Sequence, residues 1–196
     1  KKQLRRNQVL TYFIKLTTCT IGIEACGGAH YWARKLRAMG HTVKLMAPQF
    51  LKPYVKANKT DAADAEAICE AVTRPNMRFV AIKNVEQQAI LSLHRARQGF
   101  VKARTAQANQ IRGLLGEYGI TIPQGIKYVM KDMLKLLDPP EHDLPGAFTD
   151  LLKRLHTHLL VLEEQVSDLE TQINSWHSNN EYSQRLSKIP GIGPLT

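Results

Sequence analysis

A heptad pattern between residues 148 and 176 limits the folds open to this chain more than any other feature of the sequence. Its apolar residues alternate at spacings of four and three for about four repeats, which predicts one long helix with a continuous apolar seam. Such a seam needs a partner helix, either elsewhere in the same chain or in a second copy, and the sequence leaves both open. The seam consists of Phe148, Leu152, Leu155, Leu159, Leu162, Val166, Leu169, Ile173 and Trp176.

The first 82 residues have a different pattern, typical of an α/β domain. Residues 18–24 form a β-prone run, Gly27 and Gly28 break the chain, residues 29–39 have helical periodicity, and residues 42–46 form a second β-prone run. A strand, a helix and a second strand in this order predict a βαβ unit with parallel strands and a right-handed crossover. Further elements are expected as a helix at 7–16, an alanine-rich helix at 60–72 and a short strand within 76–82.

The rest of the chain is predicted to be helical. Residues 84 to about 118 contain no proline and predict one long helix, with Gly99 as a possible interruption. The proline-containing segment 119–145 predicts a connector with at most one short helix, around residues 127–137. The predicted fold class is therefore α/β plus α: an α/β domain at 1–82, a helical and coiled-coil region at 83–180, and the start of a further domain at 181–196.

The charge balance indicates a polyanionic partner. The 196 residues include 27 Lys and Arg against 17 Asp and Glu, for a net charge of +10. Neutralising phosphates releases condensed counterions, so nucleic acid is the first partner to consider, and a basic protein that binds nothing charged is the alternative. Candidate contacts with nucleic acid lie on the long helix and beside the acids described below. The basic face of the long helix is alternatively an ordinary solvated surface. The candidate contacts are Lys56, Lys59, Arg95, Arg97, Lys102, Arg104 and Arg112.

Cysteine usage and hydropathy point away from secretion and membranes. Three cysteines without CxxC spacing favour neither a disulfide framework nor a zinc site, so we expect a cytoplasmic protein. No apolar run approaches the roughly 20 residues that cross a bilayer. The chain starts without methionine and stops within an Ile-Pro-Gly-Ile-Gly-Pro string, so we expect that it is truncated at both ends.

Three carboxylates are candidates for chemistry. Glu24 follows directly on the first predicted strand, at the end where open α/β sheets place their ligands, although acids there can also be solvated or cap a helix. Asp61 and Asp64 share one face of a predicted helix, where they could hold a divalent cation. They could equally complement the positive end of the helix dipole behind Thr60, a good N-cap residue.

The combination of these acids with their surroundings carries a resemblance. Residues 23–32 (IEACGGAHYW), 43–48 (VKLMAP) and 56–65 (KANKTDAADA) resemble the N-terminal domain of bacterial insertion-sequence transposases of the DEDD group. That domain is RuvC-like and has the ribonuclease-H fold, which implies an incomplete ribonuclease-H-like domain in this chain. The later segments also resemble the family in their order. They are a basic helical region, a coiled coil, and a string at 189–196 that resembles the start of the C-terminal transposase domain.

The resemblance implies a function and a set of roles. Glu24, Asp61 and Asp64 match the second, third and fourth acids of a site that binds Mg²⁺ (or Mn²⁺) for DNA strand cleavage and exchange. The family's first acid and its serine nucleophile have no counterpart here, so we expect this chain to be inactive alone. DNA is the implied substrate, a structured guide RNA the implied partner, and the coiled coil a route to a homo-oligomer.

Two other functions remain open at the level of sequence. A structure-specific endonuclease would use the acids without a downstream serine domain. A non-catalytic nucleic-acid-binding or dimerisation fragment would bind RNA or DNA in a salt-dependent way without metal-dependent turnover.

Overall fold

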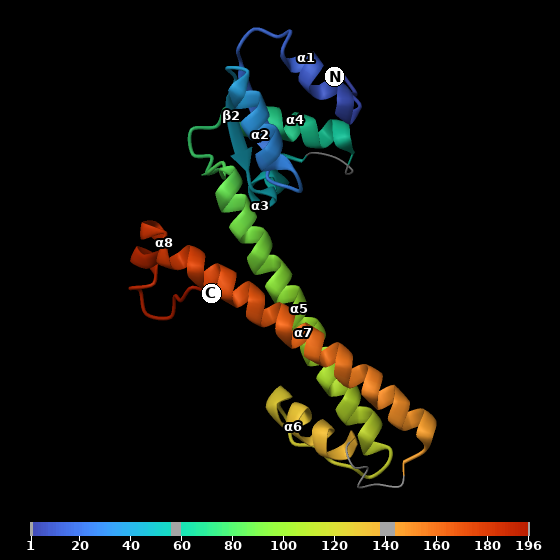
Figure 1. Ribbon diagram of the computed structural model, residues 1–196. Helices are drawn as coiled ribbons and strands as arrows, with labels where there is room; N and C mark the ends of the chain where they lie inside the picture. The colour runs from blue at the N-terminus through green and yellow to red at the C-terminus, as the bar shows by residue number, and fades with distance from the viewer. Residues whose placement is uncertain (1, 56–59, 138–143, 196) are drawn as a thin grey trace. The chain divides into compact units, whose positions relative to one another are not determined.

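The computed structural model describes residues 2–55, 60–137 and 144–195 of the chain. It contains two compact units, unit 1 at Lys1–Gln88 and unit 2 at Ala89–Thr196 (Figure 1). The predicted Lys56 and Lys59 contacts lie outside the described residues.

Unit 1 contains a three-stranded sheet in the order β1-β2-β3. Strand β1 (Thr20–Glu24) pairs in parallel with β2 (Thr42–Met46), and Glu24 lies opposite Met46 at the end of the ladder. This pairing confirms the predicted parallel βαβ unit. Strand β3 (Phe79–Val80) falls within the predicted 76–82 segment but runs antiparallel to β2, so the sheet is mixed.

One face of the sheet is covered by helix α2 (Ala29–Ala38), which connects β1 to β2 (Figure 1). Ala33 and Leu36 on α2 pack against Ile21, Val43 and Leu45 in one buried cluster. The helix begins after Gly28 and is followed by Gly40, both with positive φ, a conformation that favours glycine.

The other face of the sheet carries helix α4 (Asp61–Ala71), preceded by two short elements, α3 (Pro48–Leu51) and the 3₁₀ helix η2 (Lys52–Tyr54). Met46, Leu51, Ala71 and Val72 form a second buried cluster there. Because Met46 alternates with Leu45 along β2, the two clusters lie on opposite faces of the sheet. At the start of the unit, the predicted helix at 7–16 is shorter than expected, as a 3₁₀ turn η1 (Arg6–Gln8) and α1 (Val9–Phe13).

Unit 2 is helical. Helix α5 (Val85–Gly116) starts in unit 1 and passes Gly99 without a break; α6 (Ile126–Leu137), α7 (Gly146–Ser178) and α8 (Glu181–Leu186) follow. One core combines residues of α5, α6 and α7, namely Ala108, Ile111, Leu115, Val129, Met133, Leu136, Leu152 and Leu159.

The heptad seam of α7 is buried within this chain. Leu152, Leu159 and Ile173 are fully buried, and Leu152 and Leu159 belong to the core shared with α5 and α6. Two ion pairs flank the seam, Arg97 to Glu170 at 2.6 Å and Arg104 to Glu163 at 2.7 Å. Of the two partners that the sequence left open, helices of the same chain therefore cover at least part of the seam.

All three cysteines, Cys19, Cys26 and Cys69, are exposed free thiols. Among the helices of the described ranges, none combines the length and apolar character that spanning a bilayer requires.

Candidate functional site

A close approach between β1 and α4 sets the position of the candidate acids. Gly22 lies in the middle of β1, and a Cβ added to it would meet Ile68 Cγ2 at 2.8 Å and Val72 Cβ at 3.2 Å. Only a glycine lets the helix pack this closely on the strand. Glu24 is two residues further along β1 and therefore lies on the same face as Gly22, toward α4.

Matching spacings along the strand and the helix bring Glu24 to Asp64. Two strand residues rise by about 6.6 Å, and four helix residues by about 6 Å. Stepping from Gly22 to Glu24 on β1 therefore covers nearly the distance from Ile68 back to Asp64 on α4. With Gly22 in contact with Ile68, these matching rises allow Glu24 and Asp64 to face the same space.

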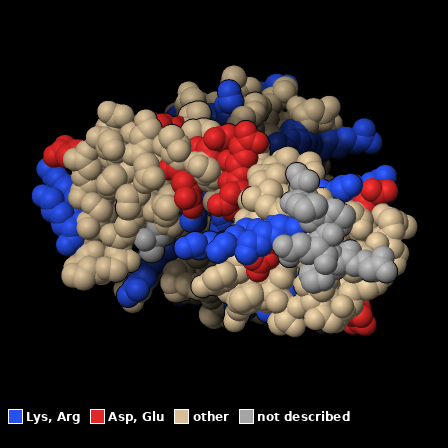
Figure 2. Space-filling model, turned by 60° about the horizontal axis from the view of Figure 1, so that its bottom comes forward, with Lys and Arg blue, Asp and Glu red and all other residues tan. Residues whose placement is uncertain are grey.

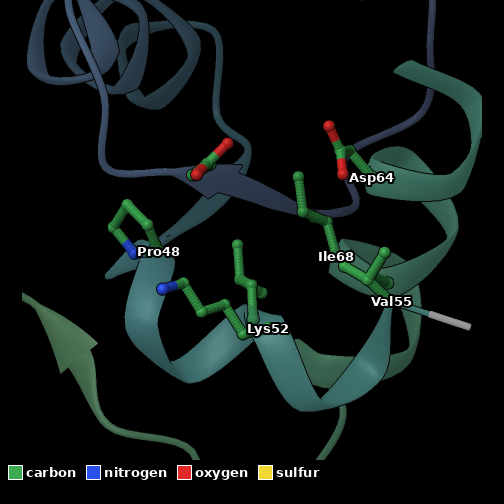
Figure 3. Close-up of a pocket in the computed structure, with 8 residues that line it drawn as sticks. Pro48, Lys52, Val55, Asp64 and Ile68 are labelled. Atoms are coloured by element: carbon green, nitrogen blue, oxygen red, sulfur yellow. The ribbon is translucent and has the colours of Figure 1, made fainter. Parts of the chain in front are cut away.

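Glu24 and Asp64 do line one pocket of about 270 Å³, which we call the acidic pocket (Figure 3). Both carboxylate residues are half-buried. Figure 3 shows Asp64 on one side of the pocket and Lys52 on the short helical segment below it. The complete lining is Glu24, Pro48, Leu51, Lys52, Val55, Asp64, Ala67 and Ile68.

Asp61, the third predicted acid, does not line the acidic pocket. It is the first residue of α4 and lines a different pocket, together with Thr60, Ala62, Ala65 and the opening residues 2–4. Asp61 and Asp64 lie about 60° apart around the helix axis, but Asp61 is about 4.5 Å further along it. It therefore extends past the end of β1, where Glu24 stands.

The donor set of the acidic pocket fits a magnesium-like ion. Mg²⁺ keeps several waters and is held by one or two carboxylates together with substrate phosphates, and Glu24 and Asp64 supply two hard oxygen ligands. Lys52 adds a cation to the same wall. Within residues 2–55, 60–137 and 144–195, no three His, Cys, Asp or Glu side chains are grouped closely enough to form a metal site by themselves.

Local sequence explains how the pocket walls form. The Thr60 hydroxyl accepts a hydrogen bond from Ala63 N at 3.2 Å and thereby fixes the start of α4 ahead of Asp64. Pro48 starts α3 at a position where its missing N–H costs nothing, and this turn carries Leu51 and Lys52 to the pocket. Neither α3 nor η2 was predicted, and Pro48, two residues after the end of β2, was the signal that could have indicated them.

The basic residues predicted to contact nucleic acid have different environments. Arg97 and Arg104 are ion-paired to α7, and Arg112 Nε donates a hydrogen bond to the Ile122 carbonyl at 3.0 Å. These three side chains stabilise unit 2. Arg95 and Lys102, by contrast, are exposed on α5.

Basic side chains also do not cover the surface evenly. In the face shown in Figure 2, Lys and Arg (blue) gather in several separate patches, and Asp and Glu (red) form groups of their own. The excess positive charge is thus available to a polyanion at discrete places.

Comparison with known proteins supplies the family. Residues 3–120 match the family model of the IS110-type DEDD transposases, described as "Transposase". A "Probable family 20 transposase" from Pseudomonas aeruginosa is 48% identical over all of this chain and 58% of its own length. The transposase for insertion sequence element IS1328 from Yersinia enterocolitica is 42% identical over all of this chain and 58% of its own length.

A third relative, the transposase for insertion sequence element IS1111A from Coxiella burnetii, is 40% identical, again over all of this chain and over 54% of its own length. The chain thus spans little more than half the length of these relatives. The family model alone covers more than half of the chain and includes Glu24, Asp61 and Asp64. The chain belongs to the DEDD family of insertion-sequence transposases.

Proposed function

We propose that this chain is part of a bacterial DNA transposase that cleaves and exchanges the strands of an insertion sequence at the acidic pocket, in the cytoplasm where the DNA lies. The observation that supports the proposal most is that Glu24 and Asp64, from a strand and a helix 40 residues apart, line the same pocket. Carboxylates arranged in this way can hold the Mg²⁺ (or Mn²⁺) that stabilises charge during phosphoryl transfer.

Each side chain has a proposed part in this chemistry. Glu24 and Asp64 would hold the cation through carboxylate oxygens, while the exposed Lys52 would draw a phosphate toward the pocket. Asp61 stays in the proposed ligand set because the family resemblance assigns it a role, and it starts the same helix one turn before Asp64.

DNA is the proposed substrate, and a structured guide RNA is the proposed partner. The exposed Arg95 and Lys102 are the side chains on α5 best placed to contact a phosphate backbone, because Arg97, Arg104 and Arg112 make contacts within unit 2. A homo-oligomer is proposed through the exposed apolar side chains beside the seam, among them Leu151 and Leu160.

The 196 residues are proposed to be inactive alone, because the resemblance assigns the first acid and the serine nucleophile to none of them. A nicking assay on supercoiled DNA with Mg²⁺ or Mn²⁺ tests this, and no nicking is expected. Nicking that Asp61→Ala abolishes would instead support the structure-specific endonuclease.

Binding of Mn²⁺, followed by electron paramagnetic resonance, tests the acidic pocket itself. We expect Glu24→Gln and Asp64→Asn each to weaken binding by about tenfold or more, since each substitution removes one of the two carboxylates that line the acidic pocket. Glu66→Gln, on α4 but outside the pocket lining, is the matched control and should leave Mn²⁺ affinity unchanged. Equal affinities for all variants would contradict the proposed site.

A further inference from the structure

A second pocket of unit 1 combines aromatic and basic side chains. Its volume is about 480 Å³, and it is lined by residues from the opening turn and from α2. These residues are Arg6, Asn7, Leu10, Tyr31 and Trp32, and we call this site the aromatic pocket. It shares no residue with the acidic pocket, and no carboxylate is among the described residues that line it.

Two aromatic rings stand next to each other at this site. Tyr31 and Trp32 are consecutive residues of α2, with ring centres 5.1 Å apart and ring planes inclined at 75°. The Tyr31 side chain is 37% exposed, and Trp32 is half-buried. The pocket therefore offers ring surface to solvent on a helix that Ala33 and Leu36 anchor in the core.

Cations accompany both rings. The Arg6 guanidinium lies 5.2 Å from the centre of the Trp32 ring, and the Lys35 ammonium lies 5.9 Å from the centre of the Tyr31 ring. A guanidinium stacked on an indole keeps its N–H edge for hydrogen bonds to a phosphate. Exposed aromatic faces with adjoining cations are the combination by which proteins hold unpaired nucleotides.

We propose that the aromatic pocket binds an unpaired nucleotide of a single-stranded nucleic acid. Its base stacks on one of the two rings and meets the other edge-on, since the ring planes are inclined at 75°, and its phosphates contact Arg6 and Lys35. A duplex would not use the rings, since its bases already stack on one another and expose mainly phosphates. An acidic peptide would use the cations but has no flat ring to stack. The proposal is independent of metal binding at Glu24 and Asp64.

Fluorescence anisotropy with labelled oligonucleotides of about 12 residues tests the proposal on the full 196-residue chain. The probes are single-stranded RNA, single-stranded DNA of the same sequence, and the matching duplex. We expect Trp32→Leu to weaken binding of a single strand by about tenfold, within the range measured for loss of one base–aromatic stack. Arg6→Gln should weaken it several-fold and lower the salt slope by about one, as expected for one lost phosphate contact.

Matched variants separate stacking from charge and from folding. Lys15→Gln removes the same charge as Arg6→Gln from an exposed position outside the pocket, and its affinity should stay within about twofold. Trp32→Phe keeps a ring and should retain most of the affinity that Trp32→Leu loses. Because Arg6 is exposed, Arg6→Gln tests the pocket even if Trp32→Leu does not fold.

A direct signal comes from Trp32 itself. In a Trp176→Phe background, Trp32 is the remaining tryptophan, and stacking of a base should quench its fluorescence. Quenching by RNA alone, or by RNA and DNA alike, supports the site and identifies its ligand. The proposal is overturned if Trp32→Leu binds single strands like the parent, if it weakens duplex binding equally, or if polyglutamate competes as well as RNA.

Discussion

Replacing Gly22 with alanine tests how the acidic pocket is built. The added Cβ would lie 2.8 Å from Ile68 Cγ2, 3.0 Å from Met46 Cε and 3.2 Å from Val72 Cβ. The Met46 methyl is the end of a flexible side chain and can move. The Ile68 and Val72 atoms sit at or next to β-branched carbons near the α4 backbone, so α4 itself must shift. Overpacking of this kind costs about 1–3 kcal/mol.

The assay is denaturant unfolding of unit 1, followed by Trp32 fluorescence in a Trp176→Phe background. Gly22→Ala should lower the free energy of unfolding by about 1–3 kcal/mol, and the displaced helix should also weaken Mn²⁺ binding, since Asp64 moves with α4. The control is Gly27→Ala, because Gly27 does not have a positive φ and a Cβ there meets no atom within 4 Å. Gly27→Ala should change the free energy of unfolding by no more than about 0.5 kcal/mol, or raise it slightly.

A second variant, Ile68→Ala, tests whether the contact with Ile68 causes the loss of stability in Gly22→Ala. Ile68→Ala removes the Cγ2 atom that the new Cβ would meet, so Gly22→Ala should cost less in that background than in the parent. The reasoning is refuted if Gly22→Ala leaves stability unchanged, or if the two substitutions add without coupling.

Three further predictions concern unit 2. Leu159→Ala, at a fully buried position, should lower the free energy of unfolding by about 2–5 kcal/mol. Gln165→Ala, at an exposed position of the same helix, should change it by about 0.5 kcal/mol or less, and similar losses for the two variants would contradict the assigned seam. A double-mutant cycle on Arg97 and Glu170, whose side chains are 24% and 34% exposed, should give a coupling of about 0.2–1 kcal/mol that shrinks with added salt. Burial lowers the pKa of His156 below its ordinary value of 6.5, so the unfolded chain takes up this proton first. The contribution of His156 to the free energy of unfolding should therefore be complete above pH 6.5 and fall as the pH drops toward the lowered pKa. In thermal melts at several pH values, His156→Leu should reduce this loss of stability at low pH, and a pH profile identical to that of the parent would contradict the assignment.

Much of the fold could be predicted, because the local patterns agree with the structure that forms. The strand at 42–46 and the helix behind Thr60 have the predicted bounds to within one residue, and α7 follows the heptad seam throughout its length. Periodicity reports which face of an element is apolar, and these elements use their apolar faces as the pattern indicates. Periodicity does not report the direction of a strand of two residues, so the antiparallel pairing of β3 with β2 could not be predicted.

The partner of a seam could not be predicted from periodicity. Leu152 and Leu159 would pack equally well against a second copy, and their burial beside Ala108 and Ile111 depends on α7 packing along α5, which the heptad pattern does not contain. The packing of α7 along α5 also brings Glu170 to Arg97, although the two residues are 73 positions apart in the sequence. A charge pattern along one helix does not contain such a partner, and the nucleic-acid contact predicted for Arg97 stays a prediction beside this ion pair.

The candidate site was predictable in part. Glu24 and Asp64 were expected to approach each other from the ends of a strand and a helix, and they line one pocket. The position of Asp61 depends on where β1 stops relative to α4, a distance that residue spacing does not contain. Lys52 lines the pocket because the short helix that Pro48 begins carries it there, and residue spacing alone does not contain that turn.

Anomalous diffraction from crystals soaked in Mn²⁺ measures whether Glu24 and Asp64 together hold one metal ion. A single strong peak is expected between the carboxylates of Glu24 and Asp64, within coordination distance of both, and it should be lost in Asp64→Asn crystals. A peak in the pocket beside Asp61 without contact to Glu24, or no peak in unit 1 under conditions where related metalloenzymes bind the ion, would contradict it.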